Sequence, residues 1–352
     1  MISKKNYKKR IENLKARRQD TLTKAIIVSK AFNKATYGET IKYVYEAMQE
    51  IDPKYTAKTY EICDKIKGHL ISGLKEAGIS VQFDYQGSVP TNTHIRLHSD
   101  IDLLTVHNNF FSLEPPQVPN FPYHGDTVLD LKNMRVKVHR ILDTVYSACT
   151  IDDSGSKALS ISGGSLQRKV DLVICNWYDS VNYSQTLDKF YRGIKILDRD
   201  NSRRILNFPF AHIENLNYKD KQVLGNLKSL IRFLKTLKVD AKEESGVNIK
   251  LSSYDIASLI YRMDNSNLML SGTKRLQLLN NCRDYFNRII SDSSFRNSLD
   301  VVNGTRKIFC DEGAKIEDLI KLKNELDDII ADILVESKPI FDTLEKAEIN
   351  YL

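Results

Sequence analysis

The sequence has few cysteines and no long hydrophobic run. Its five cysteines are scattered over 352 residues without a Cys-x-x-Cys pair, so neither a disulfide framework nor a structural zinc site is predicted. No apolar stretch approaches the roughly 20 residues that a membrane-spanning helix needs. The basic N-terminus lacks the apolar segment of a signal peptide. These absences predict a soluble protein of the reducing cytoplasm with no membrane association.

The composition is that of an ordinary globular protein. Apolar residues make up 41% of the chain and charged residues 28%, and no fixed-period repeat or low-complexity tract interrupts it. The length is sufficient for two domains with separate cores. Lysine and arginine exceed aspartate and glutamate by 52 to 45, a net charge of +7 that favours polyanionic ligands. Nucleoside triphosphates and nucleic acid both satisfy this condition.

The pattern of residues divides the chain into three parts. Residues 1–50 predict two charged helices, broken near Tyr37-Gly38 with Thr40 as an N-cap. Residues 51–210 mix helices with strands, and residues 211–352 are helical. The lysine and arginine clusters before residue 19 fit either a nucleic-acid-binding arm or a solvated helix face, and we favour the solvated face.

The most informative segment runs from Val81 to Val106. An alternating strand ends at Gly87-Ser88, where a bare backbone can approach a phosphate. About a dozen residues later, Asp100 and Asp102 lie two apart in a second apolar strand, so that both carboxylates leave the same face. Carboxylate oxygens are the ligands that Mg²⁺ prefers, and it commonly binds one or two of them together with substrate phosphates.

A third acid, Asp171, lies in an apolar strand between Val170 and Leu172. An acid in such a strand needs a partner, because burying an unpaired charge is unfavourable. The residues alone leave two interpretations open: a metal ligand, or an ion pair with Arg168 or Lys169.

Other segments carry weaker signals. Four prolines in residues 108–125 predict a surface loop. Residues 219–239 predict one helix with an apolar stripe and a basic side, for which we favour exposure to solvent. Ser253 reads as the N-cap of a following helix. The histidines beside the acidic strand are expected in loops or at the surface, namely His94, His98 and His107.

The spacing Gly87-Ser88, then Asp100-x-Asp102, resembles the nucleotidyltransferase superfamily whose core is shared with DNA polymerase β. The longer match, over residues 87–93 and 99–102, is similar to the bacterial cGAS/DncV-like nucleotidyltransferases of anti-phage signalling. The resemblance implies an α+β fold: a nucleotidyltransferase core with a mixed sheet in residues 51–210 and a helical lobe in residues 211–352. The N-terminal helices would pack across both lobes.

The resemblance also implies roles for the residues of the core. Asp100, Asp102 and Asp171 would bind two Mg²⁺ ions, which Mn²⁺ can replace, and would be the catalytic acids. Gly87 and Ser88 would hold the β- and γ-phosphates of a nucleotide. The two ions would stabilise the attacking and leaving oxygens of an in-line displacement at the α-phosphate.

Three positions of the helical lobe match the family as well. Lys235 corresponds to a lysine that contacts the donor triphosphate, Ser253 to a phosphate contact, and Tyr254 to a residue that stacks on a base. The implied reaction condenses nucleoside triphosphates into a cyclic di- or trinucleotide, with release of pyrophosphate. A separate effector protein would then recognise this product during phage infection.

The resemblance also bears on other partners. A regulatory partner is compatible with it, but a nucleic-acid activator is not supported, because no zinc-binding Cys/His insert is seen. Members that are conjugated to a partner generally end in a small residue, whereas this chain ends in Asn350-Tyr351-Leu352, which argues against conjugation.

Two alternatives stand beside this interpretation. One is a nucleotidyltransferase that modifies an RNA 3′ end, a protein or a small molecule such as an antibiotic. The other is a non-catalytic module in which the basic N-terminus, Lys221, Lys228 and Arg232 bind nucleic acid; it would tolerate loss of the acids and bind with a steep dependence on salt.

Overall fold

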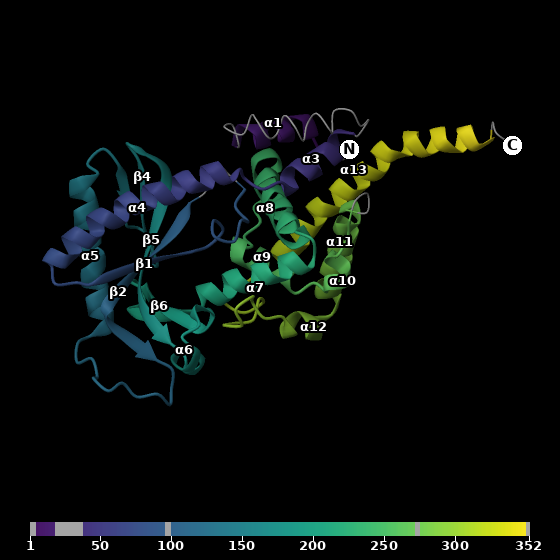
Figure 1. Ribbon diagram of the computed structural model, residues 1–352. Coiled ribbons are helices and arrows are strands. Elements are labelled where there is room, and N and C mark those ends of the chain that lie inside the picture. The colour runs from purple at the N-terminus through teal and green to yellow at the C-terminus, as the bar shows by residue number, and fades with distance from the viewer. Residues whose placement is uncertain (1–4, 18–37, 96–99, 272–274, 350–352) are drawn as a thin grey trace.

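The structure is a computed structural model that describes residues 5–17, 38–95, 100–271 and 275–349. It comprises a lobe built on a β-sheet and a lobe built of helices, which lie side by side in Figure 1. The long C-terminal helix extends away from the second lobe. No helix in these ranges combines the length and the apolar composition needed to cross a membrane.

A mixed sheet of seven strands forms the first lobe within the described residues, which confirms the predicted α+β class. The strand order is β1-β2-β5-β4-β3, and β6 pairs with β5 and β7. Strand β2 runs parallel to β5, and the other pairs are antiparallel. The strands are β1 (Val81–Gln86), β2 (Ile101–Leu113), β3 (Thr150–Asp152), β4 (Leu159–Gly163), β5 (Leu166–Asp179), β6 (Arg192–Asp198) and β7 (Arg203–Asn207).

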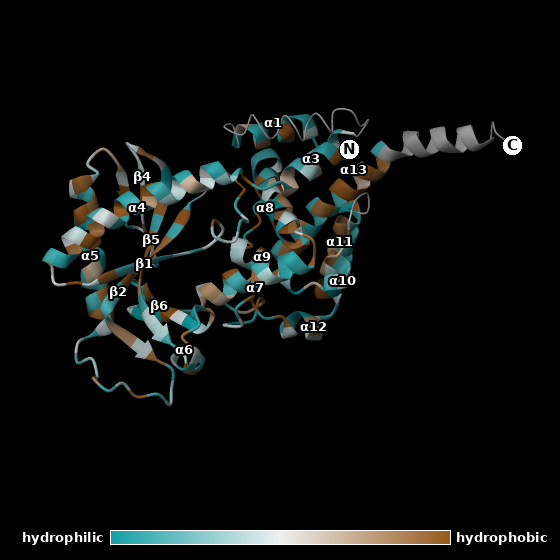
Figure 2. Cartoon of the chain, viewed as in Figure 1, coloured by the Kyte–Doolittle hydropathy of each residue, from teal (hydrophilic) through white to brown (hydrophobic). Residues whose placement is uncertain are grey.

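Each face of this sheet packs against different elements. Helices α4 (Pro53–Glu76) and α5 (Thr127–Val145) cover one face, where Ile101 and Leu103 of β2 are buried with them. Both helices are amphipathic, as the mixed colouring of Figure 2 shows. On the opposite face, Leu104 packs with Phe210 of α7 (Pro209–Gln222). Short helices α6 (Val181–Thr186) and η1 (Lys189–Tyr191) join β5 to β6.

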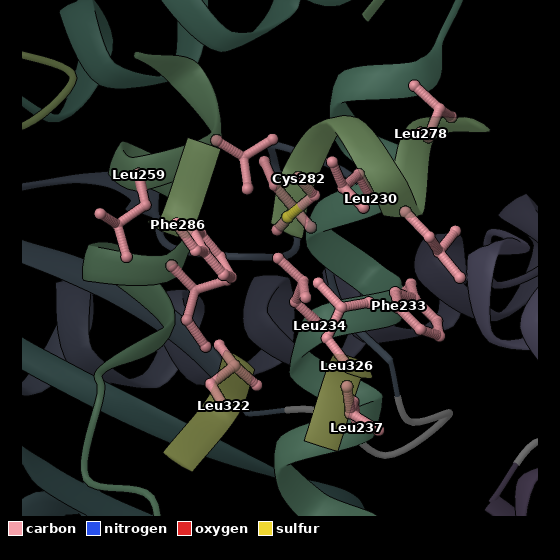
Figure 3. Packing of buried hydrophobic residues seen from close by; sticks show 14 of the residues in the cluster. Leu230, Phe233, Leu234, Leu237, Leu259, Leu278, Cys282, Phe286, Leu322 and Leu326 are labelled. Carbon is pink, nitrogen blue, oxygen red and sulfur yellow. The ribbon is translucent and has the colours of Figure 1, made fainter. Parts of the chain in front are cut away.

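The second lobe has one continuous hydrophobic core. Helix α8 lies at its centre, and its leucines contact residues of α9, α11 and α13 (Figure 3). The core also includes residues of the two N-terminal helices. The elements of this lobe are α1 (Tyr7–Arg17), α3 (Glu39–Met48), α8 (Asn226–Ser245), α9 (Ser253–Tyr261), α10 (Asn265–Leu268), α11 (Gln277–Ser291), α12 (Ser293–Ser298) and α13 (Ile316–Ile349).

Two predicted elements have different bounds. The helix predicted over residues 219–239 is two helices, α7 and α8, because Leu224 and Gly225 both adopt positive φ between them. A residue with positive φ cannot continue a right-handed helix. Strand β2 continues to Leu113, past the expected start of the loop at residue 108, and all four loop prolines follow it.

Three local predictions were also wrong. Gly38, not Thr40, is the N-cap of α3, and Ser252, not Ser253, is the N-cap of α9. His107 is buried within β2 rather than lying in a loop or at the surface. His94 lies in a loop, one of the two expected positions, but it is buried there, and burial lowers the pKa of His94 to about 4. His98 lies outside the described residues.

The N-terminal basic residues divide into two groups. Lys8 and Lys9 are exposed on α1, as the interpretation of a solvated helix face expects, whereas Lys5, Arg10 and Arg17 contact the helical lobe. Arg10 is fully buried in the helical lobe, where its guanidinium forms an ion pair with Glu244 and lies over the rings of Tyr7 and Tyr43. Arg17 forms an ion pair with Asp240, and Lys5 pairs with Glu325. These cations attach the N-terminal helix to the lobe.

We predict that Arg10→Ala destabilises the protein by about 3 kcal/mol, because it removes one partner of a buried ion pair and leaves the other uncompensated. Urea denaturation measures this change in the free energy of unfolding. Lys9→Ala, which removes an exposed charge from the same helix, should change it by less than about 0.5 kcal/mol. Equal effects of the two substitutions would contradict the structural role of Arg10.

Candidate active site

A cavity of about 540 Å³ lies between the sheet and the helical lobe. The turn after β1, the start of β2 and the middle of β5 line it on one side. Helices α7, α8 and α9 line it on the other side. All eight residues singled out in the sequence line this cavity: Gly87, Ser88, Asp100, Asp102, Asp171, Lys235, Ser253 and Tyr254. Residues up to 167 positions apart in the chain thus share one site.

The sheet register brings the acids together. Asp102 of β2 and Asp171 of β5 are direct partners in the parallel ladder, and Asp100 immediately precedes β2. Residues paired across adjacent strands project from the same face of a sheet. The other face of the same segments buries Ile101 and Val170. The alternation of apolar and acidic residues therefore places the carboxylates at the cavity.

The acids affect one another electrostatically. Burial, together with the charges of Asp171 and Asp100, raises the pKa of Asp102 to about 7. Burial also raises the pKa of Asp171. No lysine or arginine of the described residues is within ion-pair distance of Asp102. A cation bound at this carboxylate would therefore be strongly favoured.

Lys169 compensates part of this charge. Its Nζ lies 2.9 Å from Asp171 Oδ1 and 3.2 Å from Asp100 Oδ2. The ion pair that the sequence allowed for Asp171 is thus formed with Lys169. Burial alone would lower the pKa of Lys169, but Asp171 and Asp100 raise it.

Gly87 makes room for the acids. It adopts φ +86°, and a Cβ at this position would overlap Asp102 Oδ2. The following turn is fixed by two buried hydroxyls, since Thr91 Oγ1 lies 2.9 Å from Thr93 Oγ1 and donates to Gly87 O at 3.1 Å. The bare backbone predicted before Ser88 is therefore required by close packing against a carboxylate.

These residues fit a magnesium site in their chemistry. Hard carboxylate oxygens surround the position, and Asp102 is a half-buried acid that forms no ion pair in the described residues. In the described residues no group of three side chains is already spaced to hold a metal ion. Two of the carboxylates, Asp100 and Asp171, instead form ion pairs with Lys169.

Basic residues of α8 tie the turn to the helical lobe. Lys235 is 7% exposed, and its Nζ donates to Thr93 O at 2.7 Å. Arg232 donates to Asn92 O at 2.6 Å and to Met48 O at 3.0 Å. The predicted solvated stripe is thus wrong for Arg232, whereas Lys235, for which the family resemblance implies a triphosphate contact, lines the cavity. Burial lowers the pKa of Lys235 to about 8, and Lys238 and Arg232 add to this effect.

Tyr254 stands at the start of α9 with its ring held in place. Its hydroxyl donates to Asn303 Oδ1 at 2.6 Å, and its ring stacks on His212 with centroids 4.8 Å apart. Ser253 is the exposed first residue of the same helix. Helix N-termini favour anions, because their backbone N–H groups are free to donate.

Comparisons with known proteins agree with this geometry. A family model described as the cGAS/DncV-like nucleotidyltransferase C-terminal helical domain matches residues 214–331. The cyclic dinucleotide synthase CdnE of Yersinia aleksiciae is 34% identical over 308 residues, which span 86% of this chain and 79% of the relative. The c-di-GMP synthase of Capnocytophaga granulosa is 33% identical over 98% of this chain and 99% of its own length. The chain belongs to the cGAS/DncV-like nucleotidyltransferases.

Solved structures support the assignment. The STING-associated CdnE c-di-GMP synthase of Capnocytophaga granulosa superposes with a TM-score of 0.74 at 33% identity, covering 94% of this chain and 99% of that one. The corresponding synthase of Flavobacteriaceae sp. gives a TM-score of 0.76 at 27% identity, with the same coverage. This nucleotidyltransferase condenses nucleoside triphosphates into a cyclic oligonucleotide messenger of anti-phage defence.

Sequence reasoning missed three polar residues that line the cavity of this nucleotidyltransferase: Asn207, His212 and Lys238. Lys238 was detectable, because it follows Lys235 by three residues and so shares its helix face. Asn207 ends β7, and its amide donates to Gln86 Oε1 at 3.1 Å. Nothing in the local sequence around His212 marks it, since tertiary packing alone brings it to Tyr254.

We predict that Asp102→Asn stabilises the metal-free nucleotidyltransferase. The pKa of Asp102 is about 7 in the folded protein, against an ordinary value of 3.8, so between these values the folded protein retains a proton that the unfolded chain releases. The ionised carboxylate is therefore destabilising above about pH 7, and its removal should raise the free energy of unfolding by about 2 to 4 kcal/mol at pH 8.

Urea denaturation in EDTA at pH 8 and at pH 5 tests this, and the gain should shrink as pH falls toward 4. Asp143→Asn, which changes an exposed acid on α5, serves as the control and should leave stability unchanged at both values. A loss of stability in Asp102→Asn at pH 8 would contradict the unfavourable burial of that charge.

We also predict that Gly87→Ala abolishes synthesis, because the added methyl group displaces the Asp102 carboxylate. Gly163→Ala is a matched control: Gly163 has φ +79°, but an added Cβ there meets nothing within 4 Å. Both variants should lose about 1 kcal/mol of stability from the strained backbone. Only Gly87→Ala should lose product in a synthesis assay, and retained activity would show that the carboxylate has room to move.

Proposed function

We propose that this nucleotidyltransferase makes c-di-GMP from two molecules of GTP, releasing two pyrophosphates. Three relatives named c-di-GMP synthase support this choice, and two of them match 98% and 94% of the chain at 33% and 30% identity. The observation that carries the chemistry is the convergence of Asp100, Asp102 and Asp171 beside the Gly87-Ser88 turn in one cavity.

We assign Asp100, Asp102 and Asp171 as the ligands of Mg²⁺, which Mn²⁺ can replace. When bound, the metal stabilises the charge that develops on the transferring phosphate and activates the attacking ribose hydroxyl. The uncompensated carboxylate of Asp102 and its oxygen-rich surroundings support this assignment.

The remaining residues of the cavity bind and orient the nucleotides. The Gly87-Ser88 turn offers backbone N–H groups and a hydroxyl to the β- and γ-phosphates. Lys235 approaches the same phosphates from α8, and Ser253 does so from the N-terminus of α9. Tyr254 presents an aromatic ring, already fixed by Asn303 and His212, on which a base can stack.

The proposal extends to the organisation of the chain and its partner. We assign residues 51–210 to the catalytic core, and residues 211–352, together with the N-terminal helices, to the lobe that closes the cavity. The STING-associated relatives support recognition of the cyclic product by a separate effector protein.

The test is incubation of the purified protein with Mg²⁺ or Mn²⁺ and the four ribonucleoside triphosphates, singly and combined, with products identified by mass spectrometry. GTP alone should yield a phosphatase-resistant species with the mass of c-di-GMP. Asp100→Asn and Asp102→Asn should lower its formation by at least about 100-fold, as expected for loss of a transition-state contact, whereas Asp143→Asn should not. A product that requires a second nucleotide would contradict the choice of c-di-GMP.

A further inference from the structure

Lys169 occupies the position between two of the three acids. It lies on β5 two residues before Asp171, so both side chains leave the same face of the strand. Its ammonium contacts Asp171 and, across to the start of β2, Asp100. Lys169 therefore bridges Asp171 of β5 and Asp100 at the start of β2.

The two lysines that line the cavity are engaged elsewhere. Lys235 donates to Thr93 O, and Lys238 donates to Leu251 O at 2.6 Å. Within the described residues, Lys169 is the basic side chain that forms ion pairs with the catalytic acids.

We propose that Lys169 is an internal counter-ion that competes with the metal. Its ammonium holds Asp100 and Asp171 in the metal-free enzyme and moves away when a divalent cation takes both carboxylates. This inference rests on the proposed metal role of the three acids. On this proposal, the divalent metal ion replaces the Lys169 ammonium at the two carboxylates.

The geometry permits this exchange. The Lys169 side chain is 39% exposed, so its ammonium can rotate toward the solvent without crossing a buried region. Lysine carries its charge on a flexible four-carbon stem, which allows the movement. Partly exposed ion pairs contribute little each, so the exchange costs only a modest part of the metal affinity. Before the metal binds, the ammonium of Lys169 partly neutralises the charges of Asp100 and Asp171.

The test is to titrate the metal-free protein with Mn²⁺ and to follow the free ion by electron paramagnetic resonance, which needs no catalysis. Lys169→Met should bind Mn²⁺ about 3- to 10-fold more tightly than the wild type, because two weak ion pairs no longer oppose binding. Lys169→Arg retains the bridging charge and should stay within about 2-fold of the wild type. Lys157→Met removes an exposed lysine of the same lobe and should also match the wild type.

Thermal melting in EDTA gives a second measurement. Lys169→Met should melt at a lower temperature than Lys157→Met without metal, because its acids are uncompensated, and the difference should disappear when Mn²⁺ is saturating. Unchanged or weaker Mn²⁺ binding by Lys169→Met would overturn the exchange. If Asp102→Asn loses Mn²⁺ binding in the same experiment, the proposed metal site would still stand. If the wild type itself binds no Mn²⁺, both the metal site and the exchange are wrong.

Discussion

Repulsion between three carboxylates is the constraint on which the rest of the site depends. Asp102 and Asp171 are direct partners on adjacent strands, and Asp100 lies next to both. Burial of such a group is unfavourable unless a positive charge accompanies it. The fold maintains the group by burying apolar residues of the same strands, such as Leu103 and Leu172, on the other face. The favourable burial of apolar side chains on one face thus offsets the repulsion between carboxylates on the other.

The same constraint explains the arrangement of the neighbouring elements. Gly87 lacks a side chain because Asp102 needs its space. The turn that follows is held to the helical lobe by Lys235 and Arg232, both of which bond to backbone carbonyls of that turn. Helix α8 therefore couples the turn that follows Gly87 to the hydrophobic core shown in Figure 3.

The excess of basic residues has a use that the composition did not indicate. Arg10, Arg17 and Arg232 form buried or partly buried contacts inside the helical lobe and at its junction with the turn. The non-catalytic nucleic-acid module required Lys228 and Arg232 on an open surface. Instead, Arg232 is buried and Lys228 donates to Asn217 at 2.7 Å. A net charge of +7 therefore says little about an external polyanion here.

The sequence by itself determined the parts that rest on local pattern: the alternating strands of the core, the amphipathic helices α4 and α5, and the acids placed on one face at two-residue spacing. It also indicated the Gly87-Ser88 turn. Only the tertiary structure decided which residues meet across the chain, such as Asp171 beside Asp102, Lys169 between two acids and His212 on Tyr254. Periodicity fixes the face of a strand or helix, but pairing register, burial of cations and the positive-φ break before α8 depend on contacts between segments far apart in the sequence.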